Sequence, residues 1–138
     1  MRLTERLAAF PVPGWRTPAE VTAADRRILL QALHSPGPEG SILIAEEPEG
    51  PAGYIFSTTR QDYFTGESHA HVEILVVEQL AEGRGIGRFL IGAAEAWARA
   101  RGYGRITLNV FAANQRAKAL YEHLGYGAET VHYHKYLK

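Results

Sequence analysis

The sequence predicts an α+β domain built on a mixed sheet, and two features of the chain lead to that prediction. Three strand-like segments at 41–47, 52–64 and 69–77 follow one another with turn residues between them, so neighbouring strands should run antiparallel. An amphipathic run at 86–101 then separates them from further strand-like sequence, which favours a mixed sheet. A chain of 138 residues suits one core, and we expect 1–138 to form a single domain.

The composition excludes several classes of protein. The chain has no cysteine, which excludes disulfides, thiolate metal sites and a cysteine nucleophile. Its 15 basic and 15 acidic residues give a net charge of +0, so we expect no nucleic-acid partner. No apolar run approaches the roughly 18–20 residues that span a bilayer, and the opening "MRLTERLAAF" carries a glutamate, unlike a signal peptide. We therefore expect a cytoplasmic protein with no membrane partner.

The segment before the first strand is predicted to hold two helices. Apolar residues recur at helical spacing within 2–10, and "PVPG" interrupts that pattern. A second helix should run over about 17–33, because Thr17 can cap it, Pro18 occupies its first position and Glu20 completes a capping box.

The elements after the third strand alternate between helix and strand. The helix at 86–101 should bury one apolar stripe, and a strand at 105–111 should follow it. A further helix from Asn114 should stop at Gly125, and the alternating residues 128–137 predict a closing strand. The stripe expected on the first of these helices comprises Ile86, Phe89, Leu90, Ala93, Trp97 and Ala100.

The N-terminus of the helix predicted at 86–101 contains three closely spaced glycines, Gly83, Gly85 and Gly87. The first amides of a helix have no internal partner and carry the positive end of its dipole. Glycines let a ligand approach those amides closely, so the stretch indicates an anion cradle suited to a phosphate or pyrophosphate. Arg84 and Arg88 would add positive charge beside it.

Other glycine-rich patterns fit this stretch less well. A dinucleotide fingerprint, G-x-G-x-x-G, would need its third glycine where Arg88 or Leu90 stands. A P-loop would need Gly-Lys-Ser/Thr, which the sequence lacks. A surface turn with helix-capping glycines remains the alternative interpretation on these residues alone.

The second half of the chain carries a further motif, Asn-x-x-Ala-x-x-Leu-Tyr-x-x-x-Gly-Tyr. Together with the glycines, in this order, it resembles the GCN5-related N-acetyltransferase (GNAT) family over roughly residues 41–138. The cradle departs from the family at Glu82, where arginine or glutamine is usual. The sequence also shows no counterpart of the family's first strand before the first helix, so we expect either a form that lacks this strand or a truncated start. The resemblance implies a GNAT fold with a twisted sheet of about five to six strands flanked by helices. The motif residues are Asn114, Ala117, Leu120, Tyr121, Gly125 and Tyr126.

The resemblance implies an enzyme that uses acetyl-CoA as a co-substrate and needs no metal. The strand end should pair with the pantetheine arm, the cradle should hold the pyrophosphate, and two residues of the later motif should also contact the coenzyme. An acetyl group would pass to a primary amine by direct attack in a ternary complex. The cofactor-binding residues implied in this way are Leu75, Val76, Val77, Gly83, Arg84, Gly85, Ile86, Gly87, Arg88, Asn114 and Ala117.

Two side chains are candidates for acid and base. In the family a tyrosine at the position of Tyr121 commonly protonates the leaving thiolate, and the pKa values of a phenol and a thiol are close enough for that transfer. Many members keep a glutamate at the position of Glu73 as the general base. Alternation places His69, His71 and Glu73 on one side of their strand, so a water relay is plausible and His71 is the alternative base.

The acceptor and the assembly are less determined. The acceptor amine could belong to a small molecule, an antibiotic, an amino acid, a polyamine or a protein. A CoA-binding regulatory module without turnover is the alternative function. The missing first strand would leave a sheet edge unpaired, so a homodimer is one expectation, and the N-terminal segment is the other candidate to cover that edge.

Overall fold

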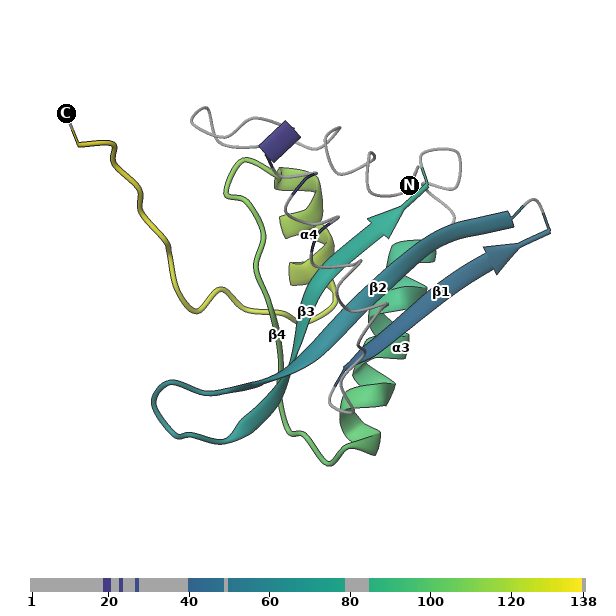
Figure 1. Cartoon of the computed structure of the whole chain (residues 1–138), viewed down its shortest axis with the longest axis horizontal. Helices are drawn as coiled ribbons and strands as arrows, with labels where there is room; N and C mark the ends of the chain where they lie inside the picture. The colour runs from purple at the N-terminus through teal and green to yellow at the C-terminus, as the bar shows by residue number, and fades with distance from the viewer. Residues whose placement is uncertain are drawn as a thin grey trace.

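Among the residues that the computed structural model describes, four strands and two helices are complete (Figure 1). The predicted helices at 2–10 and 17–33 lie outside the described residues, apart from isolated positions in the second. The cradle positions 83 and 84 also lie outside them. The residues that the structure describes are 19, 20, 23, 27, 40–48, 50–78 and 85–137.

The four strands form one mixed sheet in the order β1-β2-β3-β4. Strands β1 (Ser41–Glu47), β2 (Gly50–Gln61) and β3 (Ser68–Val77) form an antiparallel meander. Strand β4 (Ile106–Leu108) pairs with β3 in parallel, because helix α3 intervenes and returns the chain in the same direction. The predicted meander and the mixed sheet are confirmed.

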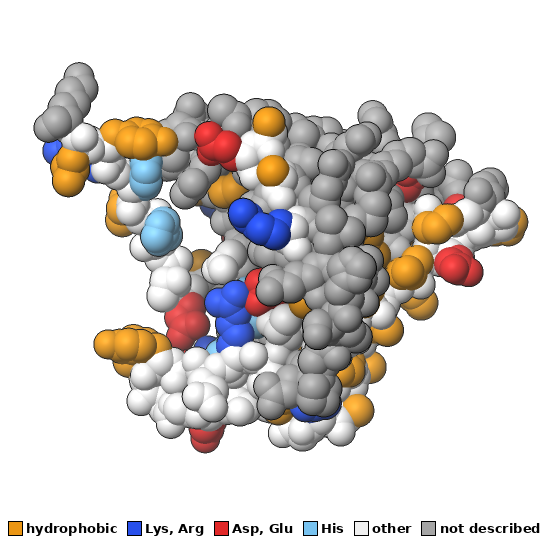
Figure 2. All heavy atoms as spheres, viewed as in Figure 1, with side chains coloured by type: hydrophobic (Ala, Val, Ile, Leu, Met, Phe, Trp, Pro, Cys, Tyr) orange, Lys and Arg blue, Asp and Glu red, His pale blue; other side chains and the backbone are white. Residues whose placement is uncertain are grey.

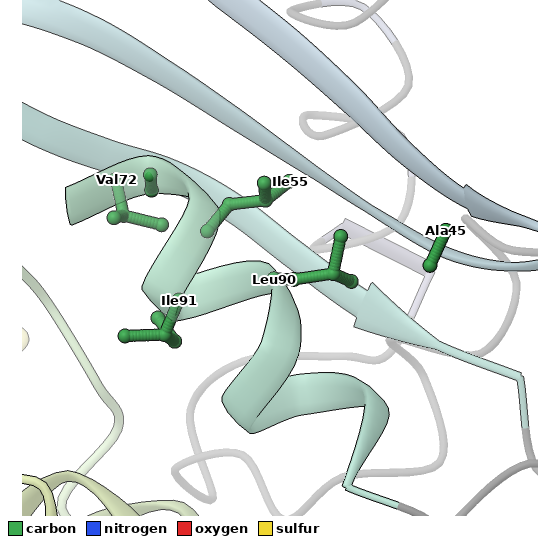
Figure 3. Close-up of a cluster of buried hydrophobic side chains, with 6 residues drawn as sticks. Ala45, Ile55, Val72, Leu90 and Ile91 are labelled. Carbon is green, nitrogen blue, oxygen red and sulfur yellow. The ribbon is translucent and has the colours of Figure 1, made fainter. Parts of the chain in front are cut away.

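Helix α3 (Ile86–Ala100) packs on one face of the sheet and forms the larger apolar core with it. Side chains from three strands and the helix point toward one another there (Figure 3). Ile55, Leu90 and Ile91 are almost completely removed from solvent. Within the described residues, no helix is both long and apolar enough to cross a bilayer.

The predicted buried stripe of α3 was wrong in part. Leu90 is buried as expected, but Phe89 is 64% exposed and Ala100 is exposed. The buried positions are Leu90, Ile91, Ala94 and Ala98. An alanine-rich helix offers apolar residues on several faces, so periodicity alone does not select the face that meets the sheet.

Helix α4 (Gln115–His123) ends as the sequence predicts. Gly125 follows the last turn with a φ of 97°, a left-handed conformation that favours glycine. The chain reversal lets Tyr126 N–H donate to the carbonyl of Tyr121 at 2.9 Å. This hydrogen bond satisfies one of the last carbonyls of the helix and brings the two tyrosines together.

The predicted closing strand at 128–137 is absent from the structure. This segment runs away from the sheet without pairing (Figure 1), and hydrophobic side chains lie exposed along it (Figure 2). Alternation predicts a strand only where a partner edge is available, and β4 pairs over three residues, with β3 alone. The described residues therefore form a sheet of four strands, where about five to six were expected.

The close packing of β2 on β3 requires glycine at position 53. A Cβ built on Gly53 would lie 2.6 Å from the carbonyl oxygen of Val76 and 3.2 Å from Cδ1 of Leu90. Because the first of these atoms belongs to the backbone, Gly53→Ala should lower the free energy of unfolding by about 1–3 kcal/mol. Chemical denaturation measures this loss.

Gly92→Ala is the matched control. Gly92 lies in α3 with no atom within 4 Å of a built Cβ, so alanine there should raise the stability by about 0.5–1 kcal/mol through helix propensity. Equal effects of the two substitutions would contradict the packing described for β2 and β3.

Candidate active site

The candidate site begins where β3 and β4 part. The two strands pair at three positions and the last pair is Val72 with Leu108. Beyond that pair they diverge (Figure 1), and β3 continues to Val77 while still paired with β2 on its other side. Among the described residues, no strand pairs with 73–77 on the side of β4. The N–H and C=O groups of this edge can therefore form hydrogen bonds with a ligand.

Three elements converge on the end of that free edge. A Cβ built on Gly87, in the first turn of α3, would lie 3.8 Å from Cγ2 of Val77 and 3.7 Å from Cδ2 of Leu120. Gly87 therefore sits between the end of β3 and helix α4. The structure brings together the strand end, the glycine stretch and the later motif, which are separate in the sequence.

The N-terminus of α3 has the features of an anion site. Gly85 is its N-cap, with a φ of 78°, no side chain caps it, and no acidic residue lies in its first turn. Arg88 is exposed and Ile86 is half-buried. The first amides of such a helix favour a negatively charged group. The expected contributions of Gly83, Arg84 and Glu82 lie outside the described residues.

Of the residues at the end of β3, Leu75 packs toward α3 and against the same core as Tyr121. Val76 is 1% exposed and belongs to the second apolar cluster, with Tyr54, Phe56 and Ile74. Strand alternation places that cluster on the sheet face opposite α3. Both faces are thus occupied by side chains, and the strand's free edge is the part that a ligand can reach.

The start of α4 is fixed by its own side chain. Asn114 is the N-cap, and its Oδ1 accepts a hydrogen bond from the Ala117 N–H at 3.2 Å. This is one of the two roles that the sequence allows for Asn114. The amide nitrogen of the side chain makes no part of the cap and can still donate to a ligand.

Tyr121 lies on α4 and packs against the core. Its ring contacts that of Tyr126 edge to face, with centroids 5.8 Å apart, and the Tyr126 hydroxyl donates to Oε2 of Glu95 at 2.7 Å. Burial raises the pKa of Tyr121 above its ordinary value. The hydroxyl therefore stays protonated at neutral pH, as a general acid must.

A β-bulge sets the polar part of the site. Ser57 pairs with Val72 and Phe56 pairs with Ile74, so Glu73 is the extra residue on β3. The bulge keeps the Glu73 side chain with the polar residues that precede it, on the face opposite α3. It also falls where β3 and β4 separate.

The Glu73 carboxylate is an ion-pair partner in this structure. Its Oε1 accepts hydrogen bonds from Thr58 Oγ1 at 2.8 Å and from Arg60 Nε and Nη2 at 3.0 and 2.7 Å. The Glu73 side chain is 16% exposed and the Arg60 side chain 52% exposed. Glu73 and Tyr121 make no hydrogen bond with each other.

His71 belongs to the same group of polar side chains as Glu73, Thr58 and Arg60, and it contacts β4. Its Nδ1 lies 2.7 Å from Thr107 Oγ1 on β4, and 6% of the residue is exposed. Burial lowers the pKa of His71, and the nearby charges of Arg60 and His69 act in the same direction against that of Glu73. The predicted grouping of His69, His71 and Glu73 on one side is confirmed.

Sequence reasoning missed three polar residues of this cluster, Thr58, Arg60 and Thr107. Their partners depend on strand register, which the turn and the bulge set, and no local pattern in the sequence shows that register. In the part of the chain that the structure describes, no three His, Asp or Glu side chains gather to hold a metal ion.

The chain resembles known acetyltransferases in both sequence and structure. The pattern of the acetyltransferase (GNAT) family matches residues 4–126. A mycothiol acetyltransferase from Beutenbergia cavernae is 45% identical over 71 residues, which is 51% of this chain and 23% of that protein. The chain thus spans about a quarter of that relative.

Solved structures extend the likeness to most of the chain. A Pyrococcus furiosus protein provisionally assigned as an acetyl transferase has a TM-score of 0.72 at 28% identity, over 93% of this chain and 82% of that one. A glucosamine-6-phosphate N-acetyltransferase from Arabidopsis thaliana has a TM-score of 0.67 at 21% identity, over 98% and 88%. An aminoglycoside 6'-N-acetyltransferase from Acinetobacter haemolyticus has a TM-score of 0.66 at 19% identity, over 85% and 83%. The chain belongs to the acetyltransferase (GNAT) family.

Proposed function

We propose that the protein is an acetyl-CoA-dependent N-acetyltransferase that moves an acetyl group to a primary amine by direct attack in a ternary complex. One observation carries the proposal: the free edge of β3 ends against the uncapped N-terminus of α3 at Gly87, beside α4. A strand edge suits the amide groups of pantetheine, and a helix N-terminus suits a diphosphate. These two features meet at one place.

The coenzyme would lie along this path from its diphosphate to its thioester. The amides at 85–88, with those expected at 83 and 84, would bind the diphosphate, and Arg88 would add positive charge. The backbone at 75–77 would pair with the pantetheine arm. Ala117 is small enough to let the arm pass α4, and Asn114 would donate from its side-chain nitrogen.

The chemistry then needs a nucleophile and an acid. The amine nitrogen attacks the thioester carbon, and the carbonyl electron pair moves to oxygen, where a backbone N–H near Val76 would stabilise it by a few kcal/mol. As the C–S bond breaks, Tyr121 would give its proton to the departing thiolate. The raised pKa of Tyr121 supports this role, because the acid form is the one required.

The acceptor should first be sought among small amines. The names of the relatives mention mycothiol, an aminoglycoside and glucosamine 6-phosphate, and none of them names a protein substrate. A panel should therefore hold aminoglycosides, amino sugars and their phosphates, amino acids and polyamines, with a peptide N-terminus and a peptide lysine for comparison.

Release of free CoA thiol tests the proposal. With acetyl-CoA and the panel, at least one amine should raise thiol release well above the amine-free rate. CoA alone should raise the melting temperature, since a ligand at 100 times its Kd adds about 2.7 kcal/mol to stability. Stabilisation by CoA without thiol release from any amine would favour the regulatory module instead.

The Gly87→Ala variant tests the coenzyme path. The built Cβ meets its neighbours at ordinary van der Waals distances, so the fold should tolerate alanine and gain helix propensity. The same methyl should hinder the approach of the diphosphate to the helix amides. Loss of one hydrogen bond to a charged group predicts a Kd for CoA about 10–150 times weaker by calorimetry.

Gly92→Ala, in the middle of α3, is the matched control and should leave the Kd for CoA unchanged. Unchanged affinity in Gly87→Ala would remove the α3 N-terminus from the coenzyme site.

Tyr121→Phe tests the general acid. Loss of an acid typically costs about 10²–10⁴-fold in rate, so kcat should fall by about that factor while the Kd for CoA changes little. In the unmodified protein, kcat should not fall with rising pH until above pH 10, because the acid form persists up to its raised pKa. A pH series of kcat measures this limit.

Tyr126→Phe is the control, because it removes a hydroxyl from the same ring pair. It should lower the stability through its lost bond to Glu95 and leave kcat much closer to that of the unmodified protein. Equal losses of kcat in the two variants would make Tyr121 a structural residue.

A further inference from the structure

The C-terminal segment 128–137 and the outer edge of β4, which is the edge away from β3, each lack a strand partner among the described residues. We infer that the protein is a two-fold dimer in which the segment of each copy pairs with the outer edge of β4 in the other copy, and the two segments pair with each other. This inference does not depend on the proposed function. It is carried by the hydrogen bonds of β4 and by the exposure and direction of the segment.

The outer edge of β4 carries backbone groups that no described strand reaches. The Ala70 N–H donates to the Arg105 carbonyl at 3.1 Å, so the backbone groups of residues 105 and 107 face β3 and those of Ile106 and Leu108 face away from it. The side chains of Ile106 and Leu108 pack against the larger apolar core but are only half-buried. A further strand along this edge would bury more of the core and satisfy the free backbone groups.

The side chains of the C-terminal segment alternate as those of such a strand should. Val131 and Tyr133 share one face of an extended chain, and they are 72% and 88% exposed. Exposed apolar side chains in a row mark an interaction site. Strand β4 alternates in the same way, with Ile106 and Leu108 toward the core and Thr107 on the opposite face. A strand with its odd-numbered residues on the core side would therefore match β4.

The start of the segment argues against antiparallel pairing with β4 of the same copy. Glu129 Oε2 accepts a hydrogen bond from Arg105 Nη2 at 3.3 Å, so the segment begins beside the residue that precedes β4. Beyond Glu129 the segment leads away on the side of β4 remote from β3 (Figure 1). From that starting point it can follow its own β4 only in parallel. The segment of a second copy can run antiparallel to β4, which is the more stable arrangement.

A two-fold exchange gives every one of these strands an antiparallel neighbour. The order across the dimer is β4, the partner's segment, the segment itself and the partner's β4. Each segment then runs in the direction of its own β4 but one strand further out, which agrees with the starting point that Glu129 sets. The two sheets become continuous, and exchange of identical elements is a common route to a closed dimer.

The segment is complementary to itself when two copies pair antiparallel with His132 opposite His132. Glu129 then lies opposite Lys135, and Val131 lies opposite Tyr133, so that each pair occurs twice. Opposite charges and pairs of an aromatic with a β-branched side chain are favourable across strands. With Tyr133 opposite itself, in contrast, Val131 would face the charge of Lys135.

The exchange also brings the second copy to the border of the candidate site. When odd-numbered side chains of the partner's segment point toward the core, the even-numbered ones lie on the face of Thr107. Thr107 contacts His71 on that face. Side chains of the partner would therefore lie beside the polar cluster at the point where β3 and β4 part.

Light scattering over a dilution series tests the dimer. The unmodified protein should have twice the 15.3 kDa mass of one chain. Val131→Lys combined with Tyr133→Lys should weaken the Kd of the dimer by about 100-fold or more, because it places like charges opposite each other twice. Both side chains are exposed in the single chain, so circular dichroism should show an intact fold. A single-chain mass for the unmodified protein at every concentration would overturn the inference.

Ile44→Lys is the matched control. Ile44 is 56% exposed on β1, at the opposite edge of the sheet, so its substitution should leave the Kd of the dimer unchanged. A dimer that Ile44→Lys dissociates and the double variant leaves intact would place the interface at β1 and overturn the exchange.

Cysteine cross-linking tests the register of the two segments. The chain has no cysteine, and directly opposite residues in antiparallel strands have Cα atoms about 4.5–5.5 Å apart, within reach of a disulfide. His132→Cys should therefore give a covalent dimer on oxidation. Lys135→Cys, also in an exposed position, is the control, because its two copies would lie about 20 Å apart along the strands. Equal cross-linking of both variants, or of neither, would contradict the pairing.

Hydrogen exchange tests whether the partner's segment lies on β4. At concentrations that favour the dimer, the amides of Ile106 and Leu108 and those at 129–135 should exchange more slowly than in the dissociated double variant. Slow exchange in the segment with unchanged exchange at Ile106 and Leu108 would overturn the pairing with β4.

Discussion

The parting of β3 from β4 after the Val72–Leu108 pair is the constraint on which the rest of the site depends. Strand β3 has 10 residues and β4 has 3, so the second half of β3 has a paired side against β2 and an open side. The N–H and C=O groups on an unpaired strand edge can form hydrogen bonds with another strand or a ligand. A coenzyme with amide groups along its arm can supply them where a fifth strand would otherwise do so.

The bulge at Glu73 acts at the same point. It reverses the side-chain alternation of β3, so that Val72 packs toward α3 and Ile74 packs on the opposite face. The polar residues before the bulge and the apolar residues after it then share one face. The bulge thereby places the polar residues where β3 and β4 separate, and the proposed coenzyme path continues beside the apolar residues that follow it.

Local patterns in the sequence predicted the features of the fold that depend on residues close together in the chain. The meander, the bounds of α3 and the Gly125 stop follow from alternation, amphipathicity and backbone freedom, and the structure confirms them. The closing strand at 128–137 was wrong because a strand needs a partner edge as well as alternation. The face of α3 was wrong at Phe89 because only the packed sheet decides which side of an alanine-rich helix is buried.

In the candidate site, too, some features could be predicted from local sequence patterns and others depend on how the strands pair. Gly87 and Val77 are distant in sequence, and the resemblance implied that both contact the coenzyme; the structure places Gly87 beside Val77 and Leu120. The ion pair of Arg60 with Glu73 and the bond of His71 to Thr107 depend on register. Register is set by a turn and a bulge, so these contacts could be read only from the structure.

A crystal structure of the protein with CoA tests the central claim most directly. The account predicts diphosphate oxygens within hydrogen-bond distance of the backbone N–H groups at 85–88, with the pantetheine amides paired to the backbone at 75–77. A coenzyme bound elsewhere, with the β3 edge and the start of α3 left facing water, would contradict it.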